Sequence, residues 1–265
     1  MSEPTYHDLP LLKPPVWTWE IPLYFFIGGA AGAAAVIGFA ARVNGAKPSL
    51  VRDARWMAAI GATASAPLLI SDLGRPERFL NMLRVFKPQS AMSVGVWTLA
   101  GFGACATGAV IAPRPLRDVA AAGSALLGLV MSTYTGVLLG VTAIPAWNAH
   151  AATLPAHFAA SALASATSLL QLRDHDEPAL HALATLAAAF EMWTGFQLER
   201  RQKPSNVMRT AGVLSGPLPL ALRLLGVKSK RARRVAAAIT IAGSLVTRFA
   251  WVEAGKTSAA QAMRS

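Results

Sequence analysis

Eight long apolar segments constrain the fold of this chain more than any other feature of its sequence. Each is close to the roughly 20 residues that a helix needs to cross a bilayer. The bilayer core offers the backbone no water, so each segment has to pair its own backbone groups as a helix, whereas the strands of a barrel would alternate polar and apolar residues. The pattern predicts an all-α fold, a polytopic membrane helical bundle of about eight transmembrane helices over residues 21–43, 54–71, 91–112, 119–144, 151–172, 179–198, 207–225 and 235–252.

The composition agrees with a membrane location. A chain with 54% hydrophobic and 14% charged residues is too apolar for a soluble domain of this size. We therefore interpret residues 1–265 as a single integral membrane domain, made of an N-terminal extramembrane segment, a transmembrane bundle and a C-terminal tail over 1–19, 20–253 and 254–265.

Proline and glycine residues affect the shape of one predicted helix and the packing of another. Gly216, Pro217 and Pro219 fall inside 207–225 and are expected to kink or break that helix. The first segment instead carries small residues at helical spacing, which allow close packing of helices, at Gly28, Gly29, Gly32 and Gly38.

The net charge of +12 does not indicate a nucleic-acid partner, because the basic residues lie in the connectors between apolar segments. That is where lysine and arginine meet the headgroups of membrane lipid. With eight spans the two termini share a side, and the basic residues number 11 on that side and 13 on the other. The tendency of basic loops to stay in the cytoplasm then predicts both termini on the outer side. No cleavable signal peptide is expected in residues 1–16, which have no basic stretch followed by a short apolar core.

Cysteine and histidine are too few for a redox centre. Cys105 is the only cysteine of the sequence, so the chain has no ligand set for an iron–sulfur cluster. Of the five histidines only His157 and His181 fall within spans, each near an end, which argues against haem. Any redox cofactor is therefore expected to be diffusible or carried by another chain.

Three charged residues, Asp72, Glu191 and Arg248, lie inside or at the edge of apolar segments and ask for a function, because burying charge in a bilayer costs a few kcal/mol. Asp72 and Arg75 are three residues apart at the end of the second segment and would share a helix face if the helix continued. The alternative is a helix stop, since Gly74 and Pro76 both end helices.

Glu191 and Arg248 are the other isolated charges. Glu191 lies in the middle of the sixth segment and Arg248 lies deep in the eighth. A carboxyl held between desolvation and a nearby cation can exchange protons, so Glu191, Arg248 and Asp72 are candidates for a proton pathway. A purely structural ion pair between helices is the alternative.

Phenols supply the remaining candidates. Tyr134 lies in an otherwise aliphatic part of the fourth segment, and Tyr24 with Glu20 lies at the mouth of the first. A phenol can donate a hydrogen bond to a carbonyl while its ring packs against a flat ligand, as a quinone headgroup requires. The alternative for Tyr134 is a hydrogen bond to a neighbouring helix, and Trp147 is interpreted as an interfacial anchor.

These residues lie in strings that resemble the NrfD/PsrC family, the haem-free membrane subunits of polysulfide reductase-like molybdoenzyme complexes. The strings are YFFIGGAAG from Tyr24, SDLGRPERF from Ser71, MSVGVW from Met92 and YTGVLLG from Tyr134. The similarity runs from about Trp19 to Glu253, and the Asp-Leu-Gly-Arg-Pro element is its most specific part.

The resemblance implies a quinone-interacting subunit of a bacterial or archaeal cytoplasmic membrane that binds menaquinone or ubiquinone. It also implies a ferredoxin-like four-cluster iron–sulfur subunit as partner, which exchanges electrons with a molybdopterin or tungstopterin catalytic subunit. Tyr134 matches the family's quinone-side tyrosine, and Asp72 and Arg75 match its loop after the second helix. Arg248 matches the last-helix arginine, and Glu191 matches an acidic proton-path residue.

One departure concerns the first helix, where family members often place an asparagine and a histidine beside the quinone. Here Glu20, Ile21 and Tyr24 stand at these positions. Two other functions stay open on the residues alone: an ion or proton transporter without a redox partner, since intramembrane acids and arginines also serve ion paths, and a passive anchor.

Overall fold

The computed structural model describes residues 15–75, 77–200, 205–226 and 229–263. The part of the expected N-terminal extramembrane segment up to residue 14 lies outside the described residues. Within the described ranges all regular structure is helical, which confirms the all-α prediction. The helices are α1 (Glu20–Val43), α2 (Pro48–Asp72), α3 (Glu77–Arg84), α4 (Ala91–Ile111), α5 (Leu116–Gly140), α6 (Pro145–Asn148), α7 (Leu154–Leu172), α8 (Pro178–Glu199), α9 (Asn206–Ser215), α10 (Pro217–Leu225) and α11 (Lys230–Ala262).

Each of the eight predicted segments is helical. The seventh is broken at Gly216, where α9 ends and the proline-containing α10 begins, as the glycine and prolines predicted. The main difference lies at the other end of the chain, where residues expected to form a tail after Glu253 continue α11 to Ala262. Alanine, lysine and glutamine are good helix formers and no proline interrupts them, so the helix continues past its apolar part.

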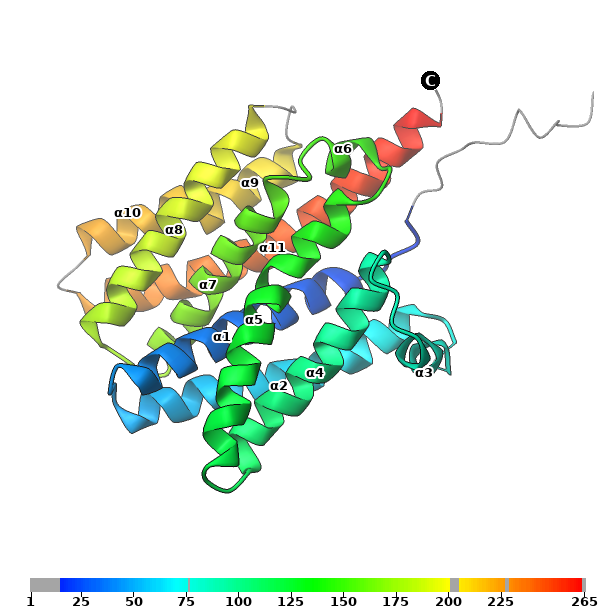
Figure 1. Cartoon of the computed structure of the whole chain (residues 1–265). Helices are drawn as coiled ribbons and strands as arrows, with labels where there is room; N and C mark the ends of the chain where they lie inside the picture. The colour runs from blue at the N-terminus through cyan, green and yellow to red at the C-terminus, as the bar shows by residue number, and fades with distance from the viewer. Residues whose placement is uncertain (1–14, 76, 201–204, 227–228, 264–265) are drawn as a thin grey trace, which may run out of the picture.

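The long helices form two groups that pack side by side, as Figure 1 shows. One group contains α1, α2, α4 and α5, and the other contains α7, α8, α11 and the pair α9 and α10. Contacts of α7 with α1 and α5, and of α11 with α1, join the groups. The short helix α3 projects from the first group beside the start of α4 (Figure 1).

Four of the described helices are long and apolar enough to cross a membrane on their own: α1, α4, α5 and α11. The chain is therefore an integral membrane protein. A total of eight crossings stays a prediction.

Small residues let α1 approach its neighbours closely. A Cβ atom added to Gly32 would lie 2.5 Å from the carbonyl oxygen of Gly128 on α5, and one added to Gly61 on α2 would lie 2.6 Å from the Ala31 Cβ. At Gly32 the two backbones meet without an intervening side chain, and at Gly61 the Ala31 methyl of α1 lies directly against the backbone of α2. This is the packing role expected of the glycines.

The start of α1 and the last part of α11 lie at one end of the bundle, which we call the termini end. There the Trp17 ring stacks on Trp147 of α6 with centroids 5.3 Å apart, and the Trp147 indole N–H donates to the Trp251 carbonyl at 2.7 Å. The opposite end holds the connections between α1 and α2, α4 and α5, α7 and α8, and α10 and α11. The shared side of the termini agrees with the sequence, and its facing outward stays a prediction.

Candidate functional site

A narrow cavity at the termini end brings together two of the residues singled out from the sequence, Tyr24 and Tyr134. The empty space between its lining side chains is about 320 Å³ when the open solvent at its mouth is counted. Apart from the two phenols its walls are apolar, and we call it the tyrosine cavity. Helices α1 to α5 all contribute to its lining, which consists of Tyr24, Leu69, Leu73, Met82, Met92, Gly95, Val96, Tyr134 and Leu138.

The Tyr134 side chain spans from α5 to α4. Its hydroxyl donates a hydrogen bond to the backbone carbonyl of Ala91 at 2.8 Å. The ring lies against the backbone of Gly95, because a Cβ atom added there would be 2.1 Å from the Tyr134 ring. Tyr134 therefore makes the contact to a neighbouring helix that the sequence left open as an alternative, while its ring forms one wall of the cavity.

Tyr24 differs from Tyr134 in having a hydroxyl with no hydrogen-bond partner among the described residues. The side chain is only 1% exposed and its ring packs beside Phe25, with centroids 5.7 Å apart. Tyr24 is thus the free donor of the tyrosine cavity.

Two carboxyl groups meet next to this cavity. The Thr18 backbone N–H donates to Asp72 Oδ1 at 3.4 Å, and the Thr18 hydroxyl donates to the Glu20 carboxylate. Glu20 lies one turn before Tyr24 on α1, and Asp72 directly precedes Leu73 of the cavity wall. Burial raises the pKa of Asp72 above its ordinary value, and the neighbouring Glu20 raises it further.

Arg75 does not join this group. Helix α2 ends at Asp72, and Gly74 then takes a positive φ of 67°, which turns the chain away before Arg75. Arg75 is exposed, and in the described structure it forms no ion pair with Asp72. The helix stop that was the alternative is what the structure contains, because glycine adopts this backbone conformation at little cost.

Glu191 and Arg248 lie in the second group of helices, away from the tyrosine cavity. Both side chains are 1% exposed. Both Glu191 oxygens and the Arg248 Nε and Nη1 atoms are buried without a hydrogen-bond partner. Arg248 donates from Nη2 to the Phe158 carbonyl at 2.9 Å, and its guanidinium lies 3.8 Å from the centre of the Phe158 ring. Four unpaired buried polar atoms on two oppositely charged groups are uncommon, because nearly all buried polar atoms in proteins are hydrogen-bonded.

Polar residues extend from this pair towards the opposite end. Ser161 donates to Ser244 at 2.8 Å, and closer to that end Arg223 donates to Gln171 at 2.7 Å. Gln171 in turn contacts a His181 ring nitrogen at 2.9 Å. This file of polar side chains, a row that runs along the second group of helices, was not predicted from the sequence. Serine, threonine and glutamine are common in apolar segments, and only the packing of the helices shows which of them lie next to one another.

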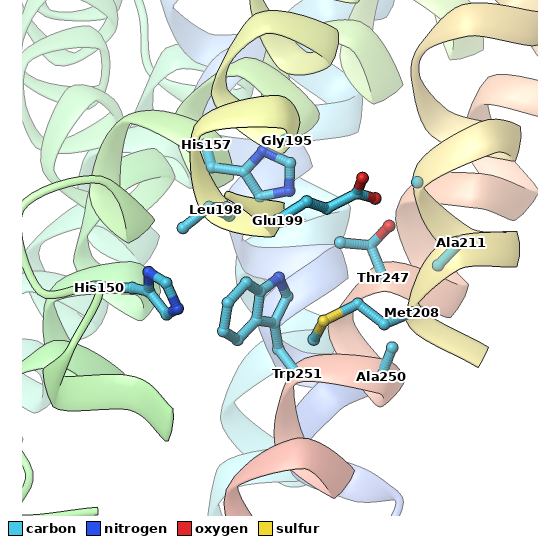
Figure 2. Close-up of a pocket in the computed structure, with 11 residues that line it drawn as sticks. His150, His157, Gly195, Leu198, Glu199, Met208, Ala211, Thr247, Ala250 and Trp251 are labelled. Atoms are coloured by element: carbon cyan, nitrogen blue, oxygen red, sulfur yellow. The ribbon is translucent and has the colours of Figure 1, made fainter. Parts of the chain in front are cut away.

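A second pocket at the termini end lies between α7, α8, α9 and α11 (Figure 2). His157 faces it and contacts the Thr194 hydroxyl through Nδ1 at 2.9 Å. The ring of His150, which forms an edge contact with Trp251 at 5.6 Å, and the Glu199 carboxylate also line it (Figure 2). From the sequence these histidines were candidates only for haem ligands, and a shared pocket was not predicted. Among the described residues no group of three or more His, Cys, Asp or Glu could hold a metal ion.

Ion pairs connect α2 with the α7–α8 connection at the opposite end of the bundle. Asp53 of α2 accepts from Arg52 at 3.3 Å and from the α7–α8 connection, through Arg173 at 3.3 Å and His175 at 3.1 Å. Hydrogen bonds from His181 and Arg233 hold the pKa of the exposed Asp176 below its usual range. These pairs were not predicted from the sequence, because their members lie up to 122 residues apart.

Comparison with known families gives one finding. The family described as Polysulfide reductase, NrfD_2, matches residues 6–262, which is almost the entire chain. Among curated proteins no match was found.

Proposed function

The chain belongs to the NrfD-type polysulfide reductase family, a family of membrane subunits of redox complexes, and we propose that it exchanges electrons between the membrane quinone pool and an iron–sulfur partner. The observation that carries this proposal is the tyrosine cavity. A buried phenol with a free hydroxyl, a second phenol and apolar walls meet there at one end of an integral membrane bundle.

The lining suits menaquinone or ubiquinone, whose flat headgroups carry carbonyl oxygens that accept hydrogen bonds. Tyr24 can donate to such an oxygen without giving up a bond, whereas Tyr134 has to leave the Ala91 carbonyl first. Leu69, Met92 and other apolar side chains can cover the ring faces. When bound, the quinone would accept two electrons and two protons, and the quinol would release them.

Proton exchange at this cavity falls to the carboxyl pair. Asp72 and Glu20 share Thr18 at the edge of the cavity, where α2 ends and the chain leaves the bundle. With its raised pKa, Asp72 can hold a proton closer to neutral pH than an ordinary aspartate does. It would pass protons between the cavity and the water at the termini end. Arg75 is exposed just after this turn, and its only role would be that of a surface charge near the entrance of the tyrosine cavity.

The electrons have to come from another chain, because the sequence has a single cysteine. We assign this role to a ferredoxin-like four-cluster iron–sulfur subunit, itself attached to a molybdopterin or tungstopterin catalytic subunit. The termini end suits the docking of that partner, since the cavity lies there beside an exposed apolar surface. On and after α3 that surface exposes Leu80, Val85 and Phe86, which are 68%, 57% and 54% exposed.

Glu191 and Arg248 would serve a proton route through the second group of helices. Their unpaired atoms lie between the His157–Thr194 contact near the termini end and the Ser161–Ser244 bond. The deprotonated Glu191 carboxylate would balance the charge of Arg248, and uptake of a proton would leave Arg248 as the buried charge, so the cation favours release of the proton again. The same file of polar side chains is the one observation that favours the alternative function, an ion or proton transporter without a redox partner.

Purification from native membranes tests the redox role. We expect iron–sulfur absorbance to accompany the chain and quinol-dependent turnover to fall when Tyr134→Phe and Asp72→Asn are combined. Asp174→Asn is the matched control, because this aspartate lies at the opposite end and is 67% exposed. Full turnover in the combined variant would show that the quinone site lies elsewhere.

Proteoliposomes separate the two functions. A redox subunit moves protons only while quinol is being turned over. A transporter moves them in a pH gradient without quinol, and it would purify without an iron–sulfur partner.

A further inference from the structure

A large pocket at the opposite end of the bundle has no part in the proposed quinone chemistry. It is an open pocket of about 1100 Å³, counting the space at its mouth, between the ends of α1 and α4 and the start of α2. Five arginines line it, and we call it the arginine pocket: Arg42, Arg52, Arg55, Arg114 and Arg117.

The arginines of this pocket outnumber the acids that pair with them. Asp118 forms ion pairs with both Arg55, at 3.1 Å, and Arg42, at 3.7 Å, and Asp53 forms an ion pair with Arg52. Five guanidinium groups against two carboxylates leave an excess of three positive charges.

Two further features show that donors remain available. The Arg55 side chain is 12% exposed, and its Nε is buried without a partner although its Nη2 contacts Asp118. Arg114 is exposed and forms no hydrogen bond or ion pair within the described residues. A guanidinium group whose charge is not balanced by a carboxylate can donate two parallel hydrogen bonds to the oxygens of one phosphate group. The chemistry of the pocket is therefore that of a site for a phosphate group.

The position of the pocket favours a phosphate attached to acyl chains. Trp56 lines it and is 48% exposed, as expected of an indole at the membrane interface. Exposed apolar side chains continue from its rim along α2 and α4, with Ile60 61% and Ile111 72% exposed. A free phosphate ion would use the arginines but none of this apolar surface.

We propose that the arginine pocket binds the headgroup phosphate of an anionic phospholipid, whose acyl chains lie along the exposed faces of α2 and α4. The lipid would neutralise the excess charge and fill the space between the helix ends. This inference does not depend on the quinone proposal.

The experiment uses the full-length chain, purified in detergent, and native mass spectrometry with added phosphatidylglycerol or phosphatidylcholine. Arg114→Gln with Arg117→Gln removes two charges from the pocket. Lys230→Gln with Arg231→Gln removes two charges at the start of α11, at the same end but outside the pocket, and is the matched control. Each arginine near a phosphate contributes about a factor of five, so the pocket variant should bind phosphatidylglycerol roughly 30-fold more weakly.

Binding of phosphatidylglycerol in preference to phosphatidylcholine, lost in the pocket variant and kept in the control, supports the proposal. Equal binding of the two lipids, or equal loss in both variants, overturns it. Displacement of the lipid by submillimolar inorganic phosphate also overturns it, because the site would then recognise the free ion.

Arg117 also donates to the Ala112 carbonyl at 2.9 Å, so the glutamine variant is accompanied by a melting curve. If that variant does not fold, hydrogen exchange of the unmodified chain decides. Protection of residues 109–118 by phosphatidylglycerol supports the proposal, and its absence overturns it.

Discussion

Replacing Tyr24 by phenylalanine should weaken quinol binding without weakening the fold. The substitution removes one oxygen from a side chain that is 1% exposed and whose hydroxyl lacks a partner among the described residues. No protein hydrogen bond is lost, so the melting temperature should stay or rise. If the hydroxyl donates to a quinone carbonyl, a bond of about 0.5–1.5 kcal/mol disappears from the complex, which weakens binding by roughly 2- to 13-fold.

Tyr134→Phe is the matched control, because it removes the same atom from the other phenol of the cavity. Here a bond to the Ala91 carbonyl is lost, so stability should fall by about 1 kcal/mol. Its effect on quinol binding should be smaller than that of Tyr24→Phe.

The assay is a quinol titration of the purified complex, with KM, kcat and the melting temperature measured for both variants. A higher KM with unchanged stability is expected for Tyr24→Phe. The reasoning is refuted if Tyr24→Phe lowers the melting temperature and leaves KM unchanged, since its hydroxyl would then have a structural partner and no ligand.

Four further predictions follow from single contacts. Gly95→Ala places a Cβ 2.1 Å from the Tyr134 ring, so it should destabilise the fold by about 1–3 kcal/mol in thermal unfolding and raise the KM for quinol. Glu191→Gln should keep quinol oxidation but slow proton movement at least about tenfold in proteoliposomes, because an amide cannot carry the proton; unchanged proton movement would exclude Glu191 from the route. Because the pKa of Asp72 is raised, its carboxylate forms only at higher pH, so quinol oxidation should rise with pH through that pKa; in the Asp72→Asn variant this limb of the pH–rate profile should be missing. Asp53→Asn should lower stability by about 1–3 kcal/mol in denaturant unfolding, since the charged acceptor for Arg173 and His175 is lost, and an unchanged midpoint would contradict this.

The helices themselves were predictable because the bilayer requires little of a sequence beyond length and hydropathy. The expected segments and the observed helices agree to within a few residues at most ends, and the break at Gly216 was expected from the adjacent prolines. The extension of α11 to Ala262 was not, because its polar residues have good helix propensity but no hydropathy signal.

Some of the candidate residues predicted from the sequence lie together in the structure, and one of them does not. Tyr24 and Tyr134 line one cavity, although 110 residues separate them, and Glu20 meets Asp72 through Thr18. Arg75 is separated from Asp72 by the left-handed turn at Gly74, which the spacing of three residues does not reveal.

What the sequence determined by itself is the class of the protein: an all-α membrane bundle of the NrfD type, with charge kept to the connectors and a few acids, phenols and an arginine left inside. These follow from local hydropathy and from short motifs. Only the tertiary structure decided which polar groups share a space, which hydroxyl is free, and that five arginines from three helices and one connection surround one pocket. Such groupings depend on the rotation and pairing of helices, and that is settled by close contacts such as Gly32 on Gly128, between residues far apart in the chain.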